Sequence, residues 1–217
     1  MPKTTAPLLS FDARGQIAKT QVYSSWKGIA YARRYTVPAN PRTVKQTANR
    51  AIWQLLNQAW LYAPASVQAA FNTFAVGKPL TGRNKFFSEN QKLLATDPTA
   101  TDLTGFVFSP GARGGLPPVS VVATPGNDLL DVAIGVPVIP AGWSVTSTVA
   151  CAIVNQDPTD AFDTTFIADV ETVAPGTNQI TGLTGGKEYV VGGFIVWERP
   201  DGLAAYSISL ATTGTPT

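Results

Sequence analysis

The hydrophobic pattern of this chain changes its period once, close to residue 105. Before that point apolar residues recur at steps of three and four, and after it they form short runs separated by Gly, Pro, Asn or Asp. The first pattern is typical of amphipathic helices and the second of strands. Between them, residues 105–118 contain four glycines and three prolines, a composition typical of a linker. We therefore predict two domains, 1–104 and 119–217, joined by a linker at 105–118.

The N-terminal half is predicted to be an α+β module. Residues 16–26 and 29–35 are rich in β-branched and aromatic residues and flank Lys27-Gly28, which indicates a β-hairpin. Three helices are then expected, at 43–62, from Pro64 to Gly77, and at 82–95. Thr43 and Thr81 are the expected N-caps of the first and third helices. Trp53 and Trp60 are expected to widen the apolar stripe of the first helix.

The C-terminal half is predicted to be an all-β domain. Its seven β-branched or aromatic runs are 119–123, 129–134, 145–155, 166–172, 179–183, 189–197 and 204–211. About 100 residues with seven strands at this spacing indicate an Ig-like β-sandwich. The single cysteine, Cys151, lies in the apolar run 149–154, so we expect a buried thiol and no intrachain disulfide.

The two halves carry opposite charge. Residues 1–100 hold 13 Lys and Arg and three acids, a net charge of +10, whereas residues 101–217 hold three bases and 11 acids, a net charge of −8. Such an asymmetry suggests two modules with different neighbours, the basic one facing an acidic or anionic partner. The candidate partner-binding residues of this anchor are Arg33, Arg34, Arg42, Lys45 and Arg50.

The same basic half also suits a nucleic acid. Its bases interleave with four aromatic residues, Tyr23, Trp26, Tyr31 and Tyr35. Exposed rings beside cations could stack on bases and contact phosphates. The competing interpretation, which we favour, places these rings in the core where the hairpin packs on the helices. Docking on an acidic protein surface would require only the positive charge of this half and no exposed aromatic rings.

No catalytic or cofactor-binding motif is legible. The chain has no histidine, the commonest general base and metal ligand, and no Gly-x-x-x-x-Gly-Lys phosphate loop. Asp157, Asp160 and Asp163 are spaced by three, which does not match a calcium loop and indicates a polar loop. We expect no enzymatic activity, no cofactor and no metal. No secretory signal or membrane-spanning segment is visible, so we expect synthesis in a cytoplasm and no membrane partner.

Two tryptophans of the C-terminal half could form a surface for carbohydrate. Trp143 and Trp197 are the surface aromatic candidates for sugar stacking, which would make the protein an adhesin. Packing in the core or at strand ends is the alternative, and we favour it.

Residues 117–215 resemble a fibronectin type III domain. Pro117-Pro118 opens the segment, Leu183 and Tyr189 stand at the six-residue spacing of that family's tyrosine corner, and the last strand ends at Gly214. The Trp usual in the second strand of the family is missing, with Ile134 nearby. The resemblance implies a fold and not a function.

The N-terminal half resembles a module of bacteriophage and prophage structural-type proteins of unknown role. The matching residues are Gly15-Gln16-Ile17, Val22-Tyr23, Gly28, Arg33-Arg34-Tyr35, Pro38-Ala39-Asn40-Pro41-Arg42-Thr43, Gln46, Arg50, the helix around Trp60, and Leu80-Thr81-Gly82-Arg83-Asn84-Lys85-Phe86. The resemblance implies a virion component made in the cytoplasm of a bacterial host.

We therefore predict a non-enzymatic virion structural protein. The preferred role is a capsid decoration or accessory protein, present in multiple copies and anchored on the major capsid protein by the basic module. A place in the tail or at the head–tail junction, on tail or neck proteins, is the first alternative. A nucleic-acid-binding accessory protein is the second, and an adhesin is the third.

Overall fold

A computed structural model describes residues 15–26, 29–37, 39–40, 42–96, 103–157, 163–171 and 177–217. The chain divides into two compact units, Met1–Arg42 (unit 1) and Thr43–Thr217 (unit 2). Within the described residues, no helix is long and apolar enough to cross a membrane.

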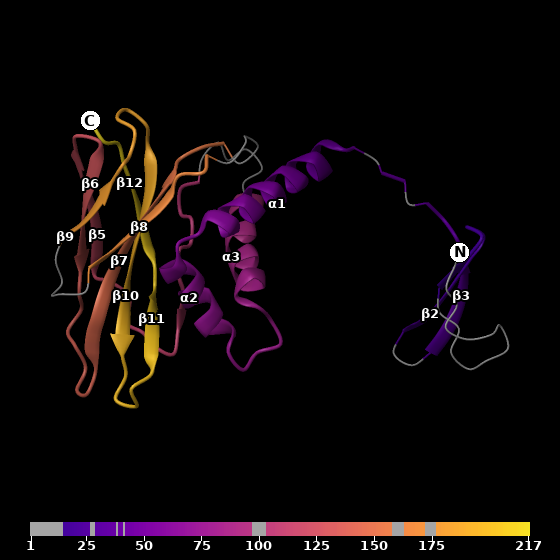
Figure 1. Cartoon of the computed structure of the whole chain (residues 1–217), viewed down its shortest axis with the longest axis horizontal. Coiled ribbons are helices and arrows are strands. Elements are labelled where there is room, and N and C mark those ends of the chain that lie inside the picture. Colours follow the sequence, from indigo (N-terminus) through magenta and orange to yellow (C-terminus); the bar gives the residue numbers. More distant parts are fainter. Residues whose placement is uncertain are drawn as a thin grey trace. The chain divides into compact units, whose positions relative to one another are not determined.

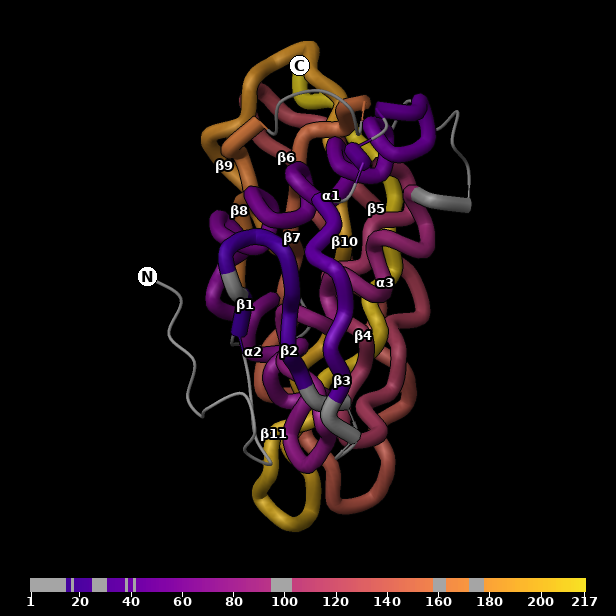
Figure 2. The backbone as a smooth tube through the Cα atoms, turned by 90° about the vertical axis from the view of Figure 1, so that its right-hand side faces the viewer, coloured from indigo at the N-terminus to yellow at the C-terminus, as the bar shows by residue number. Residues whose placement is uncertain are grey.

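Unit 1 contains a three-stranded antiparallel sheet. Its strands β1 (Gly15–Ile17), β2 (Gln21–Trp26) and β3 (Ile29–Arg34) run side by side in that order (Figure 2). The sequence predicted one strand over 16–26, but a turn splits it, with Ala18 and Lys19 at φ of 46° and 53°. Neither residue usually takes the left-handed conformation, so no turn signal was legible there. The predicted Lys27-Gly28 turn lies outside the described residues.

Unit 2 begins with three helices close to the predicted positions: α1 (Val44–Tyr62), α2 (Ala65–Ala75) and α3 (Gly82–Thr96). Both predicted N-caps are confirmed. The Thr43 Oγ1 accepts a hydrogen bond from the Gln46 backbone N–H at 3.4 Å, and the Thr81 Oγ1 accepts one from the Asn84 N–H at 3.2 Å. These bonds satisfy N–H groups that the first turn of a helix leaves unpaired.

Nine strands follow in the part of unit 2 that the structure describes, and all their pairings are antiparallel. They are β4 (Pro110–Ala112), β5 (Ser120–Gly126), β6 (Leu129–Gly135), β7 (Ser144–Val154), β8 (Phe166–Glu171), β9 (Thr177–Thr181), β10 (Tyr189–Glu198), β11 (Ala204–Ile208) and β12 (Leu210–Gly214). The larger sheet has the order β4-β11-β10-β7-β8, with β12 also paired to β10, and the smaller sheet has the order β5-β6-β9. The last predicted strand is therefore two strands, β11 and β12, and β4 was not predicted.

The larger sheet is buried on both faces. The helices cover one face and the smaller sheet lies against the other (Figure 1). Along β7, Val149, Cys151 and Ile153 belong to the core shared with the helices. The alternate residues Ala150 and Ala152 belong to the core between the two sheets. A strand buried on both sides has no polar face, which explains its continuous apolar sequence.

The segment predicted to be a linker is part of this core. Within it Phe106 and Phe108 are buried, as is Leu103 just before it. The Phe106 ring lies 5.6 Å from that of Phe86 on α3, and the Phe108 ring lies 5.9 Å from that of Phe166 on β8. The predicted boundary at 105–118 is therefore wrong, because helices and strands pack on both sides of these rings. The division between compact units falls instead between residues 42 and 43.

Candidate partner-binding surfaces

The five basic residues predicted to form one anchor are divided between the two units. Arg33, Arg34 and Arg42 belong to unit 1, whereas Lys45 and Arg50 lie on α1 of unit 2. All five are exposed. Arg33 and Arg34 are successive residues of β3, so their side chains leave opposite faces of the sheet. Arg33 and Arg34 therefore place positive charge on both faces of the unit 1 sheet.

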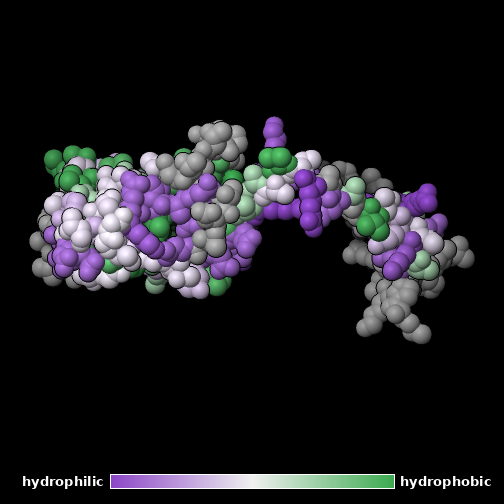
Figure 3. Space-filling model, turned by 90° about the horizontal axis from the view of Figure 1, so that it is seen from above, coloured by the Kyte–Doolittle hydropathy of each residue, from purple (hydrophilic) through white to green (hydrophobic). Residues whose placement is uncertain are grey.

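Among the residues of the unit 1 sheet whose side chains the structure describes, none is buried. Tyr23 and Tyr35 are half-buried, and Tyr31 is 41% exposed. The space-filling view shows strongly hydrophilic residues next to hydrophobic ones on this unit (Figure 3). The prediction that these rings pack on the helices stays a prediction, because the rings and the helices belong to different units. The side chain of Trp26 lies outside the described residues, and Tyr31, Arg33 and Arg34 are exposed on the sheet.

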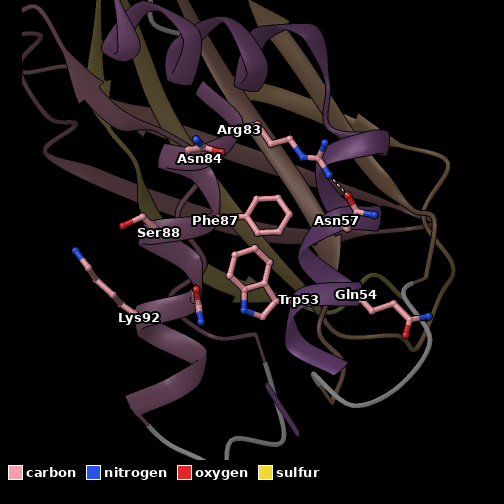
Figure 4. A pocket seen from close by; sticks show the side chains of 9 residues that line it. Trp53, Gln54, Asn57, Arg83, Asn84, Phe87, Ser88 and Lys92 are labelled. Carbon is pink, nitrogen blue, oxygen red and sulfur yellow. Dashed lines mark hydrogen bonds between the residues drawn. The ribbon is translucent and has the colours of Figure 1, made fainter. Parts of the chain in front are cut away.

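A groove lies between α1 and α3 and has a volume of about 920 Å³ (Figure 4). Its lining comes from one face of each helix: Trp53, Gln54 and Asn57 from α1, and Arg83, Asn84, Phe87, Ser88, Gln91 and Lys92 from α3.

Two aromatic rings meet in this groove. The rings of Trp53 and Phe87 lie 5.0 Å apart and are tilted by 40°. Phe87 is buried, whereas Trp53 is 49% exposed. The Arg83 guanidinium lies 5.5 Å from the centre of the Phe87 ring and donates a hydrogen bond to the Asn57 Oδ1. Both contacts hold the guanidinium in one place, with further N–H donors remaining on it.

The charged residues of the groove are all cations. Among the described residues that line it, Arg83 and Lys92 are basic and none is acidic. Arg50 lies on α1 one turn before Trp53 and Gln54, so it extends the same helix face. The Glu89 carboxylate is bonded to Lys85 and lies 4.0 Å from the Lys92 Nζ.

Sequence reasoning missed this groove because it placed Trp53 in the apolar stripe of its helix. The buried residues of α1 are Ile52, Leu55, Leu56 and Ala59, and Trp53 falls one position outside that series. This one-residue offset from the buried series was the sequence signal that could have predicted an exposed Trp53. The partners of Trp53 on α3 are some 30 residues away in the chain, and only the packing of the two helices brings them together.

Trp143 and Trp197 do not form a carbohydrate-stacking surface. Trp197 is fully buried, and its Nε1 donates a hydrogen bond to the Leu116 carbonyl at 3.1 Å. Trp143 is half-buried against it, with ring centres 6.3 Å apart and an interplanar angle of 80°. The surface hypothesis is therefore wrong for Trp197, because its indole fills the core between the sheets.

Asp163 is a structural carboxylate. It accepts hydrogen bonds from the Lys187 Nζ at 3.1 Å and from the Thr165 backbone N–H at 3.0 Å. Partial desolvation acts to raise the pKa of Asp163, but the bonds from Thr165 and Lys187 outweigh it and lower that pKa. Asp160 lies outside the described residues. Over the part of the chain that the structure describes, no three His, Cys, Asp or Glu side chains are grouped to hold a metal ion.

Comparison with known proteins adds no relative. No protein-family model matches the chain. No curated protein matches it either. The resemblances to a phage module and to fibronectin type III domains therefore remain expectations from the sequence.

Proposed function

We propose that this protein is a non-enzymatic structural component of a bacteriophage particle. Its preferred role is a capsid decoration or accessory protein, present in multiple copies. Unit 1 attaches it to an acidic surface of another virion protein, such as the major capsid protein. Attachment to a tail or neck protein is the alternative location for the same role.

The exposed sheet of unit 1 is the observation that carries this proposal. A small three-stranded sheet needs an apolar face packed on something, because an unpacked ribbon is at best marginally stable in water. None of the sheet side chains that the structure describes is buried, and Tyr31, Arg33 and Arg34 are exposed. A partner that covers the sheet would supply the missing burial. Residues 1–42 contain seven bases and one acid, so the complementary surface is acidic.

For unit 2 we propose an Ig-like sandwich of the fibronectin III type. In such sandwiches the first, second and fifth strands share one sheet, and the third, sixth and seventh share the other. Strands β5, β6 and β9 would be the first set, and β7, β10 and β11–β12 the second. The Tyr189 Oη accepts a hydrogen bond from the Thr184 N–H at 3.0 Å, which is the bond expected of a tyrosine corner. Strand β4 and the helices would be additions to that sandwich.

Purified particles provide the test. We expect mass spectrometry to find the full-length protein in particles, and cryo-electron microscopy to place it on the capsid or on the tail. Deletion of residues 1–42, or the double variant Arg33→Glu/Arg34→Glu, should abolish incorporation. Lys78→Glu, a charge reversal at an exposed site of unit 2, is the matched control and should leave incorporation intact.

Two results would overturn the proposal. Absence of the full-length protein from particles excludes a virion role. Binding of duplex DNA by the full chain, lost in Arg33→Glu/Arg34→Glu and falling steeply with salt, would assign unit 1 to a nucleic acid instead.

A further inference from the structure

We propose that the outer edge of β5 is a dimer interface, at which the β5 strands of two copies of this chain pair antiparallel about Val122. The smaller sheets of the two copies then form one continuous sheet. This interface belongs to unit 2 alone, and it depends neither on unit 1 nor on a place in a particle.

The edge of β5 is open in the part of the chain that the structure describes. β5 stands at one end of the order β5-β6-β9, in the sheet that lies away from the helices (Figure 1), and among the described strands it pairs only with β6. With seven residues it is the longest of the described strands at a sheet edge. An edge strand presents backbone N–H and C=O groups that another strand can bind.

Other edges of unit 2 carry protection that β5 lacks. β4 has three residues, begins with Pro110 and lies against α2. β8 and β9 close on each other, because the Asp169 Oδ2 accepts a hydrogen bond from the Gln179 N–H at 3.0 Å and the Asp169 carbonyl accepts one from the Asn178 Nδ2 at 3.3 Å. Short length, cover and charge are devices that keep an edge strand from pairing with another molecule. β5 contains no charged residue, and Val122 near its centre is 53% exposed.

Pro125 shows which residues of β5 direct their backbone groups outward. Proline has no N–H, so inside a sheet it is tolerated where that N–H would face away from the neighbouring strand. Backbone groups alternate along an antiparallel strand, so Val121 and Ala123 share the outward direction of Pro125. In a pairing about Val122, Val121 of each copy stands opposite Ala123 of the other. The backbone groups that face outward are therefore the ones that this register pairs.

The side chains of β5 favour a second copy as the partner. In this register Val122 lies opposite its own copy, so the two exposed side chains cover each other and leave water. Ser120 of each copy lies opposite Thr124 of the other, a pair that can hydrogen-bond across strands. Because the strand is uncharged, the two copies meet without like charges opposite each other. Val121 and Ala123 already pack on the core between the sheets, so pairing requires no rearrangement of the inner face.

Cysteine cross-linking of the full chain tests the register. Cys151 is buried, so an introduced surface cysteine is the thiol that reacts. Val122 and its copy form a non-hydrogen-bonded pair with Cα atoms about 4.5 Å apart, within the range of a disulfide, so oxidised Val122→Cys should become a covalent dimer on a non-reducing gel. Ser120→Cys is the matched control and should stay monomeric by itself, because its two copies lie about 13 Å apart along the strands. Mixed with Thr124→Cys, it should cross-link.

Analytical ultracentrifugation of the full chain measures the dimer Kd. Val122→Lys places like charges opposite each other and removes the valine contact, so we expect it to raise the Kd by about tenfold or more. Because Val122 is exposed, this variant should keep its fold, which circular dichroism checks. Thr181→Lys makes the same charge change at an exposed position of β9 in the same sheet, and it should leave the Kd within about twofold of the parent.

Three results would overturn the interface. A full chain that stays monomeric up to millimolar concentration, without cross-linking of Val122→Cys, would show that this edge does not pair. A dimer that Val122→Lys leaves intact would have to form through another surface. Cross-linking of Ser120→Cys by itself as fast as that of Val122→Cys would exclude the register about Val122.

Discussion

The side chain of Asn90 and the backbone of Val107 exchange two hydrogen bonds. The Asn90 Nδ2 donates to the Val107 carbonyl at 3.1 Å, and the Val107 N–H donates to the Asn90 Oδ1 at 2.8 Å. Asn90 is fully buried on α3, and Val107 stands between the buried rings of Phe106 and Phe108. This pair links the helical layer to the segment that leads into the sheets, where a linker was predicted.

Asn90→Ala should destabilise unit 2 as a whole. The change leaves the N–H and C=O of Val107 without their partner, and each unsatisfied buried group costs about 1–3 kcal/mol. Equilibrium urea unfolding should therefore show a loss of about 2–4 kcal/mol in the free energy of unfolding. Gln58→Ala, at an exposed position of α1, is the control and should stay within about 0.5 kcal/mol of the parent. An equally small effect of Asn90→Ala would mean that this segment is not held by Asn90.

Gly192 should be intolerant of any side chain. A Cβ at this position of β10 would overlap the ring of Phe108, which lies directly on the strand. Gly192→Ala should cost about 1–3 kcal/mol through overpacking, measured by urea unfolding. In the Phe108→Ala background the same substitution should cost much less, because the ring is gone. Additive effects of the two changes would contradict the contact.

The helices and the sheets should fold as one unit. A fragment of residues 43–217 should unfold in a single cooperative transition, detected by both far-ultraviolet circular dichroism and tryptophan fluorescence. A fragment of residues 119–217 would expose the apolar residues of β7 and β10 that face the helices, including Val149, Ile153 and Phe194. We expect that fragment to aggregate. A stable, monomeric 119–217 fragment would show that these residues fold without the helices, with a domain boundary at 105–118.

Cys151 should be inert in the folded protein. Burial raises the pKa of its thiol well above the ordinary range, so the reactive thiolate is absent near neutral pH. Under native conditions, the rate at which a colorimetric disulfide reagent labels Cys151 should be limited by unfolding of the protein. In denaturant the same reagent should label Cys151 at once. Because the folded pKa is raised, the free energy of unfolding should fall as the pH rises above about 8.5, the ordinary thiol value. Rapid stoichiometric labelling under native conditions would contradict this burial.

The pairing of Asp163 with Lys187 should add stability only above acidic pH. The lowered pKa of Asp163 means that the folded state favours the carboxylate. Its contribution is present above the ordinary Asp value of about 3.9 and disappears as the pH falls through the lowered folded value. The melting temperature of Asp163→Asn should therefore lie below that of the parent at pH 7, and the two should converge as the pH falls below the lowered folded pKa of Asp163. A constant difference across this range would exclude ionisation as its source.

Most of the helices and strands were predictable because they have local signals. The N-caps at Thr43 and Thr81, the period of the helices and the β-branched runs after residue 118 placed most elements within a few residues. The turn at Ala18 and Lys19 has no such signal, since its residues rarely adopt positive φ.

The candidate site was less predictable. Charge counts identified a basic N-terminal region, but its residues are divided between two units. The groove depends on a ring, Trp53, that local periodicity assigned to the core, and on cations that reach it only through the packing of α1 on α3.

The sequence by itself determined the element types, the caps, the buried thiol and the opposite charges of the two halves, because these follow from residue chemistry over a few neighbouring positions. Only the tertiary structure decided which elements share a core. Val149–Val154 reads as a strand in any sandwich, but which of its two faces meets the helices depends on residues far away in the chain. Phe106 and Phe108 sit among glycines and prolines, and they became core because the helices and the larger sheet close over them.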